Sequence, residues 1–221
     1  SFSCTDGNEL IPKIAMENGL NTMVGVWLSD DLEMNEIELN NAIEVAKAGH
    51  VSILAVGNEV LLRGDLTEDQ LIDYINRAKQ ALPDVEVGYA DAYYEFEDHP
   101  RMTQACDVIL ANCYPFWEGC AAEYSLLYMK DMYNRAVRAG GGKKVIISET
   151  GWPNIGSREG GAIPSIENAM RYFINTYLWA EEEGIEIFYF SSFDETWKVA
   201  AEGDVGAYWG LWDAEGRVKY A

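Results

Sequence analysis

Residues 143–153 (KKVIISETGWP) constrain the fold more than any other stretch of this sequence. Their apolar core, Val145 to Ile147, is a short β-branched run, which is typical of a strand buried on both faces. Glu149 lies near the end of this strand. The Gly-Trp-Pro that follows ends it, because Gly permits a turn and Pro cannot continue the pairing. Barrels of the (β/α) type and open α/β sheets place their chemistry at such C-terminal strand ends.

A second segment, residues 52–60 (SILAVGNEV), repeats the pattern, with Asn58 and Glu59 at its tip. Parallel strands bring their C-terminal ends to the same edge of a sheet. Two glutamates at strand tips, Glu59 and Glu149, are therefore the main indication of function.

The rest of the chain alternates between strand-like and helix-like patterns, which predicts a parallel sheet covered by helices. Strands are expected at 21–28, 50–59, 85–93, 107–115, 143–150 and 185–195, and helices at 9–18, 35–48, 67–82, 123–139 and 165–183. Residues 61–65 are expected to form a loop, and Thr67 with Gln70 a capping box.

Six full strands are predicted, and Phe2 to Cys4 resemble the end of one more. A (β/α)₈ barrel has eight strands and about 250 residues. Either the sheet is open, or the chain lacks the first one to two strands of a barrel at its N-terminus. Aromatic and acidic residues at nearly every tip favour the barrel: Trp27, Glu59, Asp91, Tyr114, Glu149 and Glu195. We therefore predict an α/β fold, an N-terminally incomplete (β/α)₈ TIM barrel, forming one catalytic domain over residues 1–221.

The net charge of −21, from 16 Lys and Arg against 37 Asp and Glu, argues against nucleic acid and anionic membranes as partners. No apolar run reaches about 18 residues, so no transmembrane segment is expected. The sequence shows no signal peptide, although a start in the middle of a strand means that one could precede it.

The cysteines and histidines do not predict a metal site. Cys4, Cys106, Cys113 and Cys120 have no zinc-ligand spacing, and the chain has two histidines. The thiols are expected to be buried or in loops, with a Cys113–Cys120 bridge as an alternative.

Two carboxylates facing one cleft suggest glycoside hydrolysis, in which one protonates the leaving oxygen and the other attacks the anomeric carbon or activates water. Asn58 would supply an amide for a sugar hydroxyl, and Trp152 a ring on which a sugar could stack. Of the seven tryptophans, six are predicted at or beyond strand tips: Trp27, Trp117, Trp152, Trp197, Trp209 and Trp212.

The motifs VGNEV (56–60), SETGWP (148–153), FDETWK (193–198) and WGLWD (209–213) resemble glycoside hydrolase family 17, whose members are β-1,3-glucan-active enzymes. VGNEVLLRGDLT and NCYPFWEG look most like its bacterial branch. The resemblance implies a (β/α)₈ barrel, a retaining mechanism and no cofactor. It makes Glu59 the acid/base on the fourth strand and Glu149 the nucleophile on the seventh, which agrees with two strands missing at the N-terminus.

Several further residues are candidate substrate contacts, each with a structural alternative. Glu195 and Lys198 match the family's Glu and Lys in the loop after the last strand, where they would contact each other or substrate. The alternative is that they form a purely structural ion pair. Asp91 and Asn112 would bind sugar hydroxyls or satisfy loop backbone. Tyr114 and Trp117 would form a stacking platform with Phe116, unless Tyr114 is packed in the core. Trp27 is expected to be a core residue.

We predict a retaining glycoside hydrolase that cleaves the β-1,3-glucosidic bonds of laminarin-type glucan, with β-1,3-glucan or a laminari-oligosaccharide as its substrate. The alternatives are glucanosyl transfer through the same covalent intermediate and, from another class, glucan binding without catalysis. We expect a secreted or periplasmic location, or a domain of a larger membrane-associated protein.

Overall fold

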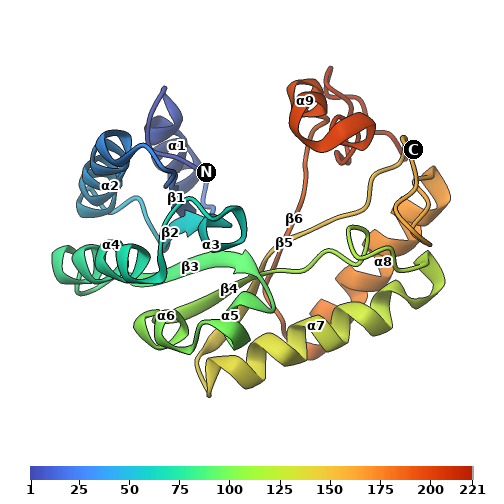
Figure 1. Cartoon of the computed structure of the whole chain (residues 1–221). Coiled ribbons are helices and arrows are strands. Elements are labelled where there is room, and N and C mark those ends of the chain that lie inside the picture. The colour runs from blue at the N-terminus through green and yellow to red at the C-terminus, as the bar shows by residue number, and fades with distance from the viewer. Residues whose placement is uncertain (221) are drawn as a thin grey trace. The chain divides into compact units, whose positions relative to one another are not determined.

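The computed structural model describes residues 1–220 and contains a six-stranded sheet with the order β1-β2-β3-β4-β5-β6 (Figure 1). The strands are β1 (Met23–Val26), β2 (Ile53–Asn58), β3 (Glu86–Ala92), β4 (Val108–Asn112), β5 (Lys144–Thr150) and β6 (Ile187–Tyr189). The pairs β1–β2, β2–β3 and β5–β6 are parallel, as the alternation of strands and helices predicts.

The α-helices connect these strands in sequence order. They are α1 (Ile11–Glu17), α2 (Leu32–Lys47), α3 (Val60–Arg63), α4 (Glu68–Ala81), α5 (Glu95–Asp98), α6 (Pro100–Ala105), α7 (Ser125–Gly140), α8 (Ile166–Glu183) and α9 (Val199–Glu202). Single 3₁₀ turns occur at η1 (Asn8–Leu10), η2 (Ala122–Tyr124), η3 (Thr196–Lys198) and η4 (Gly203–Val205).

The chain divides into two compact units, and each is described by itself. Unit 1 comprises residues 1–111 and 135–145, and unit 2 comprises residues 112–134 and 146–221.

Unit 1 is built on β1, β2 and β3, with α2 and α4 lying along these strands (Figure 1). The strands read as apolar runs because both faces are covered, and Leu54, Val56 and Val87 are fully buried. Helix α4 begins with the predicted capping box: Thr67 Oγ1 accepts a hydrogen bond from the Gln70 amide, and the Gln70 side chain accepts one from the Thr67 amide.

The first residues of the chain bond to β1 in the manner of a neighbouring strand. The Gly25 amide donates to the Ser1 carbonyl (2.7 Å), and the Ser1 amino group donates to the Met23 carbonyl (3.1 Å). A Cβ on Gly25 would collide with the backbone of Phe2, so Gly permits this close approach. The predicted strand end therefore lies against β1.

Unit 2 contains the end of β5, β6 and the long helix α8. Ser165 caps α8 by accepting a hydrogen bond from the Asn168 amide (3.1 Å), and Gly184 ends the helix in the left-handed conformation (φ 68°). Both helix ends agree with the sequence prediction. The side chains of Tyr172 and Trp179 on α8 are buried.

Two expectations for local structure are wrong. Part of the segment expected as a loop at 61–65 belongs to the short helix α3. The strand expected over 185–195 spans only Ile187–Tyr189, because the residues after it pair with the C-terminal segment: the Ser191 amide donates to Trp209 and the Asp194 amide to Trp212.

The alternative of a Cys113–Cys120 bridge is also wrong. All four cysteines are free, and three of them are buried. Over residues 1–220, no helix has the length and apolar character needed to cross a membrane.

Candidate active site

In unit 1, the chain turns sharply at the end of β2, where Glu59 lies. The register between β2 and β3 shifts between Ala55 and Asn58, Gly57 has a φ of 89°, and Glu59 itself adopts a left-handed φ of 55°. The Glu59 amide donates to the carbonyl of Ala90 on β3 (2.8 Å). Non-glycine residues seldom adopt this conformation, and they cluster at functional sites when they do.

Asp91, at the end of β3, is fully buried and bonds to the loop that follows β2. Its Oδ2 accepts from the Tyr89 hydroxyl and from the Leu62 amide (3.4 Å), and its Oδ1 accepts from the Ala92 amide (2.7 Å). Burial raises the pKa of Asp91 to about 7, against an ordinary value near 3.8. These bonds agree with the alternative that Asp91 satisfies loop backbone, and a contact with a sugar hydroxyl stays a prediction.

Trp27 lies at the same end of the sheet, after β1, and is not a core residue as expected. Its side chain is 39% exposed, and the Arg63 guanidinium lies 4.8 Å from its ring centroid. Arg63 also donates to the carbonyls of Leu28 (2.9 Å) and Asn58. Arg63 thereby ties the ends of β1 and β2 together.

In unit 2, Glu149 lies near the end of β5 beside residues that follow β4. The Tyr114 hydroxyl donates to Glu149 Oε2 (2.8 Å), and the Cys113 amide donates to the Glu149 carbonyl (2.9 Å). Asn112 is buried, and its Oδ1 accepts from Ser148 Oγ (2.7 Å). Tyr114 is half-buried and bonds to the Glu149 carboxylate, and its expected place in a stacking platform stays a prediction.

An aromatic cluster surrounds Trp209 in unit 2. The rings of Tyr114, Phe116 and Trp117 lie 5.4–5.5 Å from the Trp209 ring, between centroids. Trp117 is 42% exposed, so its expected role as a stacking surface stays a prediction. Trp209 is expected from the sequence only as one of the tryptophans at or beyond the strand tips, and its side chain is buried.

Trp152 does not form the expected stacking surface. Its side chain is fully buried, its ring contacts those of Phe116 and Tyr172, and its Nε1 donates to the carbonyl of Ile163 (3.1 Å). The motif position next to Glu149 suggested a platform, but packing buries the indole against Phe116 and Tyr172.

Glu195 and Lys198 contact each other, with 3.1 Å between Lys198 Nζ and Glu195 Oε2. Lys198 Nζ also lies 3.8 Å from Glu202 and 3.9 Å from the centroid of the Phe190 ring. The structure brings this pair together as expected, and a contact of either residue with substrate stays a prediction.

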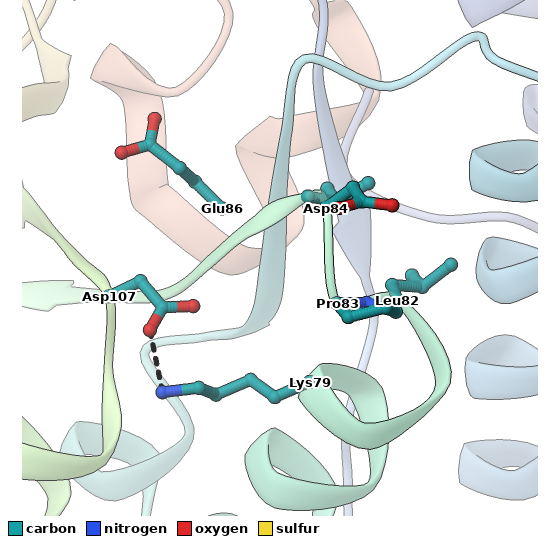
Figure 2. A pocket seen from close by; sticks show the side chains of 7 residues that line it. Lys79, Leu82, Pro83, Asp84, Glu86 and Asp107 are labelled. Carbon is teal, nitrogen blue, oxygen red and sulfur yellow. Dashed lines mark ion pairs between the residues drawn. The ribbon is translucent and has the colours of Figure 1, made fainter.

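A separate pocket in unit 1 lies at the opposite ends of the strands. Figure 2 shows Lys79, at the end of α4, paired with Asp107, which precedes β4, at 2.6 Å. The pocket is also lined by residues 82–86, which lead into β3. Because enzymes of this fold class work at the C-terminal strand ends, this pocket is not the candidate active site. Among residues 1–220, no cluster of His, Cys, Asp and Glu could hold a metal ion.

The family model described as BtgE/BtgC glycoside hydrolase domain matches residues 1–210. The chain belongs to this glycoside hydrolase family. Its structure also resembles that of a family 17 β-1,3-glucanosyltransferase from Rhizomucor miehei, with a TM-score of 0.90 and 28% identity, over 99% of this chain and 82% of that one. The predicted resemblance to glycoside hydrolase family 17 and the (β/α)₈ fold class are thereby confirmed.

Two curated relatives of this family 17 chain are fungal. A glucan 1,3-β-glucosidase of Candida albicans is 28% identical, over 100% of this chain and 80% of its own length. One of Saccharomyces cerevisiae is 27% identical, over 100% and 78%. An endo-laminarinase from Formosa has a TM-score of 0.83 at 19% identity, over 99% and 75%, which supports the fold alone. The predicted similarity to the bacterial branch stays a prediction.

Proposed function

We propose that this family 17 member acts on β-1,3-glucan by a retaining mechanism. The observation that carries the proposal is the placement of a glutamate at the C-terminal end of each of two sheet strands: Glu59 directly after β2, and Glu149 on β5 with the Tyr114 hydroxyl on its carboxylate. The substrate class follows from the relatives, which are named as glucan 1,3-β-glucosidases and a β-1,3-glucanosyltransferase.

In the proposed mechanism, the Glu149 carboxylate attacks the anomeric carbon while Glu59 protonates the leaving glycosidic oxygen. The glycosyl–Glu149 ester then reacts with an acceptor hydroxyl, whose proton returns to the Glu59 carboxylate. A retaining pair requires carboxyl groups about 5–5.5 Å apart. The Tyr114 hydroxyl donates to one oxygen of the Glu149 carboxylate, the group that would attack.

The proposed substrate contacts supplement these glutamates. Trp117 offers an exposed ring to a sugar face, and Asn58 offers an amide next to Glu59. Asn112, Glu195 and Lys198 stay candidates for sugar hydroxyls.

Glucanosyl transfer is the second candidate function. It differs from hydrolysis only in the acceptor, a sugar hydroxyl in place of water. It is favoured by the similarity to the Rhizomucor miehei β-1,3-glucanosyltransferase, an active-site mutant of which is described in complex with laminaritriose.

Incubation with laminari-oligosaccharides tests both functions. Shorter products alone mean hydrolysis, and products longer than the substrate mean transfer. We expect Glu149→Gln to lower turnover by at least about 10³-fold while laminarin binding persists, because the amide cannot attack the anomeric carbon. The matched control is Glu167→Gln on the exposed first turn of α8, which should retain full activity. If the unaltered protein binds laminarin without cleaving or extending it, a non-catalytic glucan-binding function replaces the proposal.

We further propose that residues 1–221 act as one catalytic domain, completed by a segment that supplies further barrel strands. Supporting this, β4, α7 and β5 each have residues in both units, so neither unit is a continuous stretch of chain. On α8, apolar side chains that face solvent would pack against such a segment: Ile166, Met170, Ile174, Tyr177 and Leu178. A secreted or periplasmic location, or a place in a larger membrane-associated protein, would bring the enzyme to polymeric glucan.

A further inference from the structure

The helix that follows Glu59 is too short to supply hydrogen-bond partners for the amides of its own first turn. Helix α3 has four residues, and the leading amides of any helix lack partners within it. A helix of this length is not stable by itself, so contacts from elsewhere determine its position. Glu59 is the N-cap residue of α3 and has a left-handed backbone conformation, so its position depends on the position of this turn.

Two side chains of β3 supply the missing partners. The Leu61 amide donates to the Tyr89 hydroxyl (2.9 Å), and the Leu62 amide donates to Asp91 Oδ2 (3.4 Å). The Tyr89 hydroxyl in turn donates to Asp91 Oδ2. Together with the bond from the Glu59 amide to Ala90, three successive residues of β3 therefore bond to the backbone from Glu59 to Leu62.

Tyr89 and Asp91 are themselves held rigidly. Both are fully buried, the Tyr89 ring packs against that of Phe96 (6.3 Å between centroids), and the Ala92 amide fixes Asp91 Oδ1. A Cβ on Gly57 would lie 3.2 Å from the Tyr89 ring, so the bulge before Glu59 rests on the same tyrosine. Burying a carboxyl group is costly unless donors satisfy it. One of the donors to Asp91, the Leu62 amide, belongs to the turn that follows Glu59.

We propose that Tyr89 and Asp91 are positioning residues for the acid/base Glu59, holding the first turn of α3 so that the glutamate carboxyl group meets the glycosidic oxygen. This inference rests on the proposed function. A displacement of about 1 Å in a catalytic group can lower a rate about 100-fold. The contacts of Tyr89 and Asp91 with this turn should therefore affect the rate of the step that uses Glu59.

The test compares a reaction that needs Glu59 with one that does not. Cleavage of laminaritetraose requires an acid to protonate the leaving sugar. The second reaction uses 2,4-dinitrophenyl β-laminaribioside with azide as the acceptor. Its dinitrophenolate leaves without being protonated, and azide then displaces Glu149 from the glycosyl ester without a base, which gives the glycosyl azide. Tyr89→Phe and Asp91→Asn should lower kcat for laminaritetraose about 10- to 100-fold with little change in KM, and leave the dinitrophenyl–azide reaction within about threefold of wild type.

Tyr74→Phe is the matched control, because it removes a buried tyrosine hydroxyl from α4 in the same unit and should leave both reactions unchanged. Equal losses in the two reactions, or no loss in either, would overturn the positioning role. Tyr89→Phe removes a single oxygen, so it keeps the test valid if Asp91→Asn does not fold. Glu59→Ala tests the proposed function separately: it must lose laminaritetraose cleavage and retain the dinitrophenyl–azide reaction. If it cleaves laminaritetraose normally, the acid/base assignment itself fails.

Discussion

At the residue scale, this protein pairs each proposed catalytic glutamate with a tyrosine hydroxyl in a different way. Tyr114 bonds directly to the Glu149 carboxylate, whereas Tyr89 bonds to the backbone two residues after Glu59. The first contact holds one oxygen of the Glu149 carboxylate, and the second holds the backbone turn that follows Glu59. The proposed nucleophile is thus held through its side chain, and the proposed acid/base through its backbone.

The buried Asp91 should make stability depend on pH. The carboxyl pKa is raised by burial and by the charges of Glu95 and Glu59, and it is partly lowered by the donors from Tyr89 and Ala92. A folded-state pKa of about 7, above the ordinary 3.8, means that the native protein binds the proton more tightly. The stabilisation is complete below about pH 4 and is lost as pH rises through about 7.

Between pH 5 and pH 8, we therefore expect the wild-type free energy of unfolding to fall by about 1–3 kcal/mol more than that of Asp91→Asn. Urea denaturation at several pH values measures this difference. The exposed Asp84→Asn should follow the wild type. Parallel curves for wild type and Asp91→Asn would show that Asp91 does not titrate in this range.

At the element scale, two of the long helices begin where a side chain supplies a partner that the helix itself lacks. Helices α4 and α8 have side-chain caps of their own in Thr67 and Ser165. Helix α3 relies on β3 instead, so its position depends on the sheet.

Thr67→Ala should destabilise the protein by about 1 kcal/mol, because it removes the oxygen that accepts from the Gln70 amide. This corresponds to a decrease in Tm of roughly 2–4 °C for a chain of this size. Thr67→Ser keeps the oxygen and should retain the wild-type Tm in thermal denaturation. An unchanged Tm for Thr67→Ala would mean that the capping box contributes nothing measurable.

At the scale of the whole molecule, the proposed chemistry uses two glutamates, Glu59 and Glu149. If both act on one glycosidic bond by double displacement, the first product formed from laminarin carries the β configuration at its new reducing end. ¹H NMR during the first minutes of reaction, before mutarotation, distinguishes the anomers. An initial α-anomer would indicate inversion, with carboxyl groups about 6.5–9.5 Å apart and no glycosyl ester on Glu149.

The sequence by itself determined the order of strands and helices, the two glutamates at strand tips and the family. These features follow from local patterns: β-branched runs, caps such as Thr67 and Gly184, and contiguous motifs. Only the tertiary structure decided that Trp152 is core, that Tyr114 bonds to Glu149 and that β6 ends at Tyr189. The physical reason is that burial and hydrogen-bond partners depend on which segments contact each other in the folded chain. Residues that are adjacent in the sequence do not determine those tertiary contacts.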